Sequence, residues 1–386
     1  MTYIERSITG KLQELSTQFP AVFLTGPRQS GKSTLLIHAF PDYRYLNLEN
    51  SDTRQFASED PRGFLESCGT KVILDEIQRV PELFSYLQTR IDSENVPGMY
   101  LLSGSQNFLM LKGISQSLAG RVGVLSLLPF SLGELADSSF SPHSVEHWIV
   151  RGCYPRVITV NIPPENFYPS YIHTYVERDV RNETSVRDLS RFRTFLVACA
   201  ATVGSLVNLT DLGRNIGADA RTVSSWLSIL EESYVTFRLT PYYQNVGNRH
   251  IKTAKLYFYD TGLLCSLLGI ETEDALLSSK RFGTIFENAV MVEKRKQIYN
   301  VGKMPRMFFW RDQGNRDKEV DLVVEQSLDS LELYEIKSSL TANRHYLDTM
   351  ERFAEKSPAE CLLRVVYRGE DIRSTDGPSF LNWRSL

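Results

Sequence analysis

The run from Gly26 to Ser33, GPRQSGKS, most constrains what this chain can fold into. It matches the pattern G-x-x-x-x-G-K-[ST] at every fixed position. The apolar, partly β-branched residues 21–25 precede it, and residues 34–40 follow with apolar side chains at helical spacing. The sequence therefore predicts a buried strand, a glycine loop and a helix. That arrangement turns backbone N–H groups and a helix N-terminus toward a phosphate, so we expect a nucleoside triphosphate to bind here.

The residue types in this loop suit that chemistry. Gly26 and Gly31 permit the backbone angles and the close approach that a Cβ atom would block. Lys32 is expected to reach the β- and γ-phosphates, and the Ser33 hydroxyl is expected to bind Mg²⁺. The predicted nucleotide-binding residues are Gly26, Pro27, Arg28, Gln29, Ser30, Gly31, Lys32, Ser33 and Thr34.

Residues 71–78, KVILDEIQ, are predicted to form the second half of this site. An apolar run that ends in carboxylates places them at the carboxyl end of a strand, where Mg²⁺ would lie. Asp75 is the predicted Mg²⁺ ligand, directly or through water. Glu76 is the candidate that polarises the attacking water.

Two further features of the N-terminal third have two interpretations each. At the end of the strand predicted from Met99, one of Ser105, Gln106 or Asn107 either reaches the γ-phosphate or caps the next helix. Arg121 is either an arginine finger, acting in cis or across a subunit interface, or an ordinary surface arginine.

Composition limits the class of protein. The 386 residues suggest two or three domains, and 42% apolar with 23% charged residues is typical of a soluble globular chain. The net charge of −3 gives no argument for binding nucleic acid or anionic membrane over the whole surface. No signal peptide or membrane span is predicted, so we expect a cytoplasmic protein. The cysteines are far apart and are expected to be reduced thiols: Cys68, Cys153, Cys199, Cys265 and Cys361.

Several runs make the chain resemble a large prokaryotic family of AAA-type ATPases with a C-terminal domain of unknown function. They are LTGPRQSGKST, YLNLEN, ILDEIQRVPELFSYLQ, LLSGSQNFLM and SQSLAGRVGVLSLLPFSLGEL, with RGCYPRV and YVERDVR further on. The resemblance covers nearly the whole chain, although Cys153 stands where a second glycine is expected after Gly152. It implies ATP and Mg²⁺ as ligands of Lys32, Ser33, Asp75 and Glu76.

The middle of the chain predicts a winged helix. A buried helix over residues 191–203 is followed by a helix and turn, by a recognition-type helix over 219–232, and by strands at 234–239 and 255–259. Nine Arg or Lys against five Asp or Glu between residues 187 and 255 favour contact with phosphates. A lid or a protein-contact module is the alternative. Before it, Arg178 and Arg181 either sense nucleotide or pair with neighbouring acids.

The last third resembles the core of a PD-(D/E)xK nuclease. Asp321 begins a strand, Glu335-x-Lys337 follows on the next strand, and Glu287 lies on a helix before them. Glu335 and Lys337 are expected on one face of their strand. Glu287, Asp321 and Glu335 would bind Mg²⁺, and Lys337 would activate water or hold the scissile phosphate. The alternative is a solvated strand face, because alternating charges usually mark one. A strand over residues 361–367 is expected to complete the sheet.

The predicted fold is α/β: a P-loop NTPase parallel sheet with helices on both faces, followed by a winged helix and a restriction-endonuclease-like α/β domain. The expected boundaries are 1–135 for the ATPase domain, 136–185 for a helical connector, 186–262 for the winged helix and 263–386 for the nuclease-like domain. We expect an ATP-hydrolysing protein that acts on or with DNA and that forms a homo-oligomer. The alternatives are a signalling or scaffold ATPase with an inactive nuclease-like domain, and an ATP-dependent remodeller of a protein partner.

Overall fold

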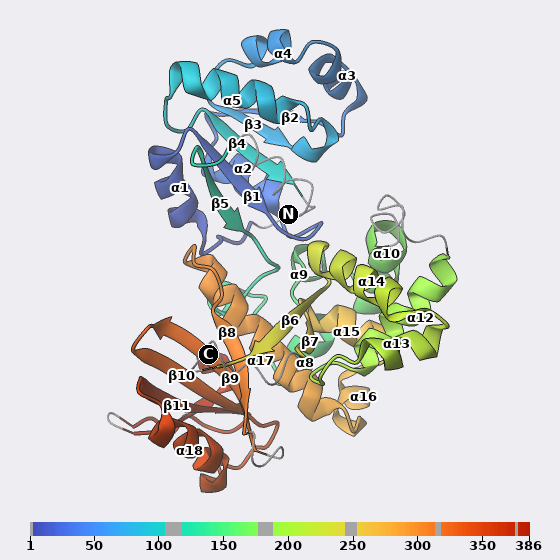
Figure 1. Cartoon of the computed structure of the whole chain (residues 1–386), viewed down its shortest axis with the longest axis vertical. Helices are drawn as coiled ribbons and strands as arrows, with labels where there is room; N and C mark the ends of the chain where they lie inside the picture. The colour runs from blue at the N-terminus through green and yellow to red at the C-terminus, as the bar shows by residue number, and fades with distance from the viewer. Residues whose placement is uncertain (1–2, 105–117, 177–187, 244–252, 313–317, 375–376) are drawn as a thin grey trace.

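The computed structural model of the protein describes residues 3–104, 118–176, 188–243, 253–312, 318–374 and 377–386 (Figure 1). The expectations for Ser105, Gln106, Asn107, Arg178 and Arg181 lie outside these ranges. Within them, no helix combines the length and the apolar character that crossing a membrane requires.

The N-terminal domain is built on a five-stranded parallel sheet with the order β2-β3-β4-β1-β5. Its strands are β1 (Ala21–Thr25), β2 (Arg44–Asn47), β3 (Val72–Asp75), β4 (Tyr100–Gly104) and β5 (Val122–Ser126). Its helices are α1 (Thr9–Gln18), α2 (Lys32–Ala39), α3 (Ser51–Glu59), α4 (Pro61–Cys68) and α5 (Leu83–Glu94), with a 3₁₀ turn at Ile77–Arg79.

Two hydrophobic cores cover the two faces of this sheet because alternate side chains of each strand point in opposite directions. Val22 and Leu24 of β1 pack with α1 and α2, whereas Phe23 packs with α4 and α5. All five residues of β1 are buried, as expected for a central parallel strand. The predicted P-loop NTPase architecture is confirmed: a parallel sheet with helices on both faces.

A helical region follows β5 and fills the right-hand side of Figure 1. Its elements are α7 (Leu132–Leu135), α8 (Val145–Arg151), α9 (Pro155–Thr159), α10 (Pro164–Tyr171), a π-helical turn (Ile172–Val176), α12 (Leu189–Ala201), α13 (Leu209–Ile216), α14 (Ala220–Glu232), α15 (Thr261–Leu267) and α16 (Glu273–Ser278). Local signals set the turn between α13 and α14: Gly217 ends α13 in the left-handed conformation, and the Asp219 side chain caps α14 through the Thr222 N–H group.

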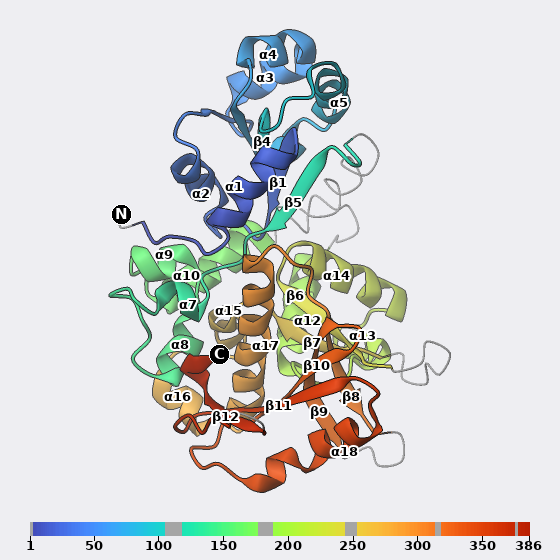
Figure 2. The same ribbon diagram turned by 90° about the vertical axis from the view of Figure 1, so that its left-hand side faces the viewer.

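The C-terminal part forms a seven-stranded mixed sheet with the order β12-β11-β10-β9-β8-β6-β7. The strands are β6 (Thr236–Pro241), β7 (Lys255–Phe258), β8 (Met307–Arg311), β9 (Glu319–Ser327), β10 (Ser330–Ile336), β11 (Glu360–Tyr367) and β12 (Ser379–Asn382). The helices against it are α17 (Phe282–Asn300) and α18 (Asp348–Lys356), with 3₁₀ turns at Arg344–Leu347 and Trp383–Ser385. One sheet face packs on α17 in the largest core, and the other packs on α18, which lies below the strands of the sheet in Figure 2.

Two features of this sheet depart from the sequence-based expectations. The strand at residues 361–367 does not complete the sheet, because β12 pairs with β11 in parallel beyond it. In addition, Thr240 and Pro241 of β6 pair with Phe308 and Phe309 of β8. The hairpin expected to end a separate winged helix is therefore continuous with the C-terminal sheet, which crosses the boundary expected between residues 262 and 263.

Candidate functional site

The glycine loop lies at the carboxyl end of β1 and leads directly into α2, at the lower edge of the N-terminal sheet in Figure 1. Gly26 has φ +147° and Gly31 has φ +96°, and a Cβ atom on Gly26 would collide with the Leu127 carbonyl oxygen. Lys32 is buried, and its Nζ donates to the carbonyl oxygens of Gly26 (3.0 Å) and Pro27 (2.8 Å). The loop therefore curls around its own lysine. The ammonium group of Lys32 lies inside the loop, where a phosphate is predicted to bind.

The Asp75 carboxylate accepts hydrogen bonds from three hydroxyl groups, which lie on three neighbouring segments. Ser33 Oγ donates to Oδ2 at 2.7 Å, Tyr45 Oη donates to the same oxygen at 2.6 Å, and the Ser103 hydroxyl donates to Oδ1. Asp75 and Ser103 are both buried. The structure thus brings the two predicted Mg²⁺ ligands, Ser33 and Asp75, into contact.

Sequence reasoning missed Tyr45 and Ser103. Ser103 carries a detectable signal, since it is a polar residue at the end of the otherwise apolar strand β4, next to the strand of Asp75. Tyr45 carries none, because a tyrosine in a β-strand usually indicates only packing.

Glu76 lies in a strained position beside this cluster. It has a left-handed backbone (φ +57°), which is uncommon for a residue other than glycine, and the Gln78 side-chain amide donates to its carboxylate at 2.5 Å. Burial raises its pKa above the usual value, and the charges of Lys32 and Arg28 oppose that shift. Its role in activating water stays a prediction.

Arg121 lies away from the glycine loop. It precedes β5, at the amino end of the parallel sheet, where it forms an ion pair with Asp92 at 2.5 Å. Because the loop follows the carboxyl end of β1, the structure does not bring Arg121 to the nucleotide site of its own chain. The cis form of the arginine finger is therefore not supported by this geometry, and the form that acts across a subunit interface stays a prediction.

Residues outside the predicted motif form hydrogen bonds to the loop and to the segments next to it. Arg6 is buried and donates to the carbonyl oxygens of Ser30 (3.0 Å) and Leu128 (2.7 Å) and to the Glu134 carboxylate (2.9 Å). From the helical region, Tyr234 Oη donates to Thr25 Oγ1 at 3.3 Å. The loop is thus bonded to the N-terminal segment through Ser30, and the end of β1 is bonded to the part of the chain that follows β5 through Thr25.

A cavity of about 140 Å³ lies beside the start of α2. The Tyr3 and His38 rings form one wall and stack with their centroids 4.0 Å apart. The remaining lining residues are Ile4, Arg6, Gly31, Thr34, Phe130, Pro155 and Thr159. The cavity is therefore mostly apolar and adjoins the loop through Gly31.

The structure also gathers the four residues predicted in the C-terminal third. The β9–β10 register sets Tyr334 opposite Leu322, which brings Glu335 beside Asp321. Lys337 Nζ lies 2.6 Å from Glu335 Oε1 and 3.6 Å from Asp321 Oδ2. Glu287 of α17 lies close enough for its negative charge to raise the pKa of both Glu335 and Lys337. The strand and helix elements thus place a carboxylate–lysine cluster where the pattern predicts it.

A second lysine enters this cluster from β7. Lys255 is buried and forms ion pairs with Glu287, at 3.5 Å, and with Glu319 of β9. Tyr257 Oη donates to Glu287 at 2.5 Å. Sequence reasoning missed Lys255, Glu319 and Tyr257; a lysine at the start of the otherwise apolar run KLYFY is the one available signal.

Burial and mutual repulsion change the acidity of these groups. Burial raises the pKa of Glu335 to about 8, helped by Asp321 and opposed by Lys337. Burial likewise raises the pKa of Glu287 to about 7, opposed by Lys255 and helped by Asp321. Across the described ranges, no three or more His, Cys, Asp or Glu side chains are arranged to hold a metal ion. The ammonium groups of Lys255 and Lys337 pair with these carboxylates.

Comparisons with known protein families match three consecutive segments of the chain. The AAA domain family matches residues 18–136, a domain of unknown function (DUF8612) matches residues 142–274, and a second domain of unknown function (DUF4143) matches residues 282–386. Among solved structures, the Walker-type ATPase PABY2304 of Pyrococcus abyssi aligns with a TM-score of 0.43 and 17% identity, over 69% of this chain and 96% of that chain. The Thermotoga maritima RuvB Holliday junction branch migration motor aligns with a TM-score of 0.31 and 18% identity, over 60% and 87%.

Two curated mycobacterial proteins are more similar in sequence. An uncharacterized protein of Mycobacterium tuberculosis is 30% identical over 327 residues, which are 83% of this chain and 71% of that protein. An uncharacterized protein of Mycobacterium bovis matches with the same identity and coverage. The chain therefore belongs to the family of these two proteins, as an AAA-type P-loop protein that continues into the domains of unknown function DUF8612 and DUF4143.

Proposed function

We propose that the N-terminal domain binds ATP with Mg²⁺ and hydrolyses it. The contact between Ser33 and Asp75, 2.7 Å long, carries this proposal. It brings a hydroxyl and a carboxylate oxygen together beside Lys32, and these are the donors that Mg²⁺ takes next to the phosphates in P-loop sites. On ATP binding, Lys32 would exchange its two loop carbonyl partners for the β- and γ-phosphates.

The nucleobase is proposed to enter the cavity beside Gly31. Its volume of about 140 Å³ is well below that of a site for a whole ligand, so it suits only one part of the nucleotide. The stacked Tyr3 and His38 rings offer an aromatic wall, and the phosphates would then follow α2's first turn into the loop.

Hydrolysis is proposed to use Glu76 to orient the attacking water. Its carboxylate follows the Mg²⁺ ligand Asp75 directly, and its left-handed backbone turns it out of the line of the strand. A raised pKa makes it a better proton acceptor than an ordinary surface glutamate, although it must still ionise to act. Arg121 is proposed as an arginine finger only toward a neighbouring subunit of a homo-oligomer.

Binding and turnover of Mg·ATP by the full-length chain test this proposal. Lys32→Ala is expected to lose tight binding and hydrolysis together. Glu76→Gln is expected to bind ATP and not to hydrolyse it, because it keeps the loop and loses the acceptor. Wild-type protein that binds no ATP would refute the proposal, and equal turnover in Glu76→Gln would refute the role of Glu76.

As a second function, we propose that the region after β5 acts on or with DNA. The observation that favours cleavage is the meeting of Glu335, Asp321 and Lys337 at one point of the sheet. Glu287, Asp321 and Glu335 would bind Mg²⁺ once the lysines move aside, and Lys337 would hold the scissile phosphate. DNA would contact the exposed side of α14, which carries Arg221 and turns away from the core.

The alternative is a signalling or scaffold ATPase whose nuclease-like domain does not cut. Lys255 favours this alternative, because it is buried and pairs with Glu287 and Glu319, in the region where a metal ion would have to bind. An ATP-dependent remodeller of a protein partner is the remaining proposal.

Nicking of plasmid DNA in Mg²⁺ or Mn²⁺ separates these functions. Cleavage that Lys337→Ala and Asp321→Asn abolish would establish a nuclease. Salt-sensitive DNA binding without cleavage would favour a DNA-binding scaffold, and neither activity would favour signalling or a protein partner.

A further inference from the structure

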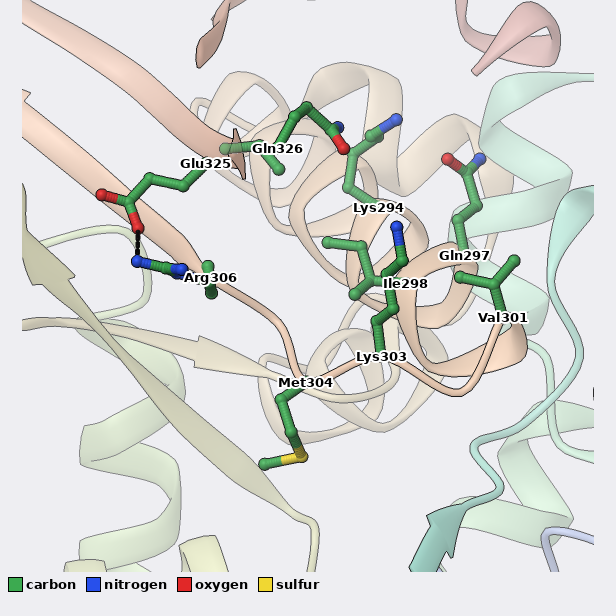
Figure 3. Close-up of a pocket in the computed structure, with 10 residues that line it drawn as sticks. Lys294, Gln297, Ile298, Val301, Lys303, Met304, Arg306, Glu325 and Gln326 are labelled. Carbon is green, nitrogen blue, oxygen red and sulfur yellow. Dashed lines mark ion pairs between the residues drawn. The ribbon is translucent and has the colours of Figure 1, made fainter. Parts of the chain in front are cut away.

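A cavity of about 490 Å³ lies between the end of α17, the loop that follows it and β9 (Figure 3). Its volume is within the range of small-molecule sites. The lining residues are Lys294, Gln297, Ile298, Val301, Lys303, Met304, Arg306, Val324, Glu325 and Gln326. None of them belongs to the nucleotide loop or to the Glu287–Lys337 cluster, so the cavity is separate from both sites described above.

The charges around this cavity do not balance. Three cationic side chains face one carboxylate, which leaves a formal charge of +2. Arg306 is neutralised, since its guanidinium lies 2.6 Å from Glu325 (the dashed line in Figure 3). Within the described ranges, Lys294 and Lys303 have no carboxylate within 4.0 Å. Among the described residues, the excess charge therefore resides on the ammonium groups of Lys294 and Lys303.

Of the two lysines, Lys294 has the more unusual environment, because burial lowers the pKa of its ammonium group. A half-buried lysine normally has an anionic partner. Its nearest ring is Tyr334, with Nζ 5.1 Å from the centroid, and Glu332 acts on it only at a distance. Glu332 accepts a hydrogen bond from Tyr334 Oη and is paired with Arg364, which opposes its effect on Lys294, and Glu293 is the other carboxylate that acts on Lys294 at a distance.

The rest of the lining suits an organic ligand rather than a bare ion. Within the described part of the chain, the amides of Gln297 and Gln326 make no hydrogen bond, which leaves donors and acceptors for a ligand. Ile298, Val301 and Met304 supply an apolar wall, and Val301 and Met304 are 59% and 78% exposed. Figure 3 shows these side chains coming from the last turns of α17 and from the loop after it.

We propose that this cavity binds a small phosphorylated metabolite of nucleotide size. Lys294 and Lys303 would hold its phosphate, the glutamine amides its polar groups, and Ile298, Val301 and Met304 its apolar or planar part. A nucleic acid is not the ligand favoured here. Its backbone needs an extended basic surface, whereas these two charges lie in one concave site.

The test uses the full-length chain carrying Lys32→Ala, which disables the nucleotide loop, with AMP and inorganic pyrophosphate as probes in calorimetric titrations. AMP is expected to bind, and Lys303→Met is expected to weaken binding about tenfold or more, because one charged contact is lost. Lys303 is exposed, so this substitution leaves folding intact. Lys280→Met, at an exposed lysine before α17, is the matched control and is expected to change nothing.

Hydrogen exchange locates the bound probe. Protection of residues 294–306 by AMP, lost in Lys303→Met and kept in Lys280→Met, supports the proposal. The proposal is overturned if neither probe binds at millimolar concentration, if Lys303→Met binds as tightly as its parent, or if only a DNA oligonucleotide binds. Because the chain already lacks Lys32, each of these results leaves the ATP proposal untouched.

Discussion

Arg6 gives the sharpest test of how the nucleotide loop is held. Its guanidinium and the Glu134 carboxylate lie 2.9 Å apart, and their side chains are only 3% and 1% exposed. Removing one partner of a buried ion pair leaves the other charge uncompensated, which costs about 3–5 kcal/mol. Arg6→Met is therefore expected to destabilise the N-terminal domain by about that amount, and it also releases the Ser30 carbonyl oxygen of the loop.

The pH dependence of this loss follows from Glu134. Burial alone would raise its pKa, but Arg6 and the N–H groups of Ser131 and Ser7 outweigh burial and lower it. In the wild type, this group therefore stabilises the fold above its unfolded pKa, and the contribution disappears as pH falls. Arg6→Met reverses the sign, because burial then dominates. The difference between the two proteins is expected to grow from about pH 4 to pH 7.

Pulsed hydrogen exchange in urea measures this loss in the N-terminal domain alone. A destabilisation of about 3–5 kcal/mol lowers the midpoint of unfolding by roughly 1–2 M urea. Arg6→Met/Glu134→Gln is expected to recover part of it, since no buried charge remains. Arg62→Met, at an exposed arginine of α4, is the control, with a change within about 0.5 kcal/mol. A loss below about 1 kcal/mol that does not vary with pH would refute this reasoning.

Three further predictions concern single groups. Tyr45→Phe removes a 2.6 Å donor to the Asp75 carboxylate and is expected to cost about 1–2 kcal/mol in urea unfolding. Gly26→Ala is expected to abolish ATP binding because its Cβ would collide with a backbone carbonyl, whereas Gly10→Ala, with open space around it, is expected to bind normally. The pKa of about 8 for Glu335 means that the folded state retains a proton which the unfolded state has lost. Without divalent ions, Glu335 is therefore expected to lower wild-type stability between about pH 5 and 8 by up to about 1.4 kcal/mol per pH unit. Glu335→Gln is expected to remove this contribution and to leave that of Glu287, whose pKa is raised to about 7.

The N-terminal domain was predictable because its signals are local. The motif and the apolar spacing on either side of it predict the strand, the loop and the helix around Gly31. The acids at the end of β3 follow from the same argument. Arg6 was not predictable, because its partners Leu128 and Glu134 lie more than 120 positions away and no periodicity connects them.

In the C-terminal third, the sequence predicted the carboxylate–lysine cluster but not the strand pairing around it. The order of these residues in the sequence predicted that Glu287, on a helix, would meet Asp321, Glu335 and Lys337 of the sheet. The register of β9 and β10 accounts for the meeting of Asp321 and Glu335. The pairing of β6 with β8 involves only Thr240 and Pro241 of β6, so no alternation of residues in the sequence predicts it. Lys255 lies on β7, which pairs with β6, so its position beside the acids follows from the three-dimensional arrangement and not from the run KLYFY alone.

Steady-state ATP hydrolysis by the full-length chain tests the central claim most directly. The wild type is expected to hydrolyse ATP with Mg²⁺, and Lys32→Ala is expected to lose this activity. Lys71→Ala, at an exposed lysine next to the opposite end of β3, is expected to retain it. Hydrolysis that persists in Lys32→Ala, or a wild-type protein that neither binds nor hydrolyses ATP, would contradict the account.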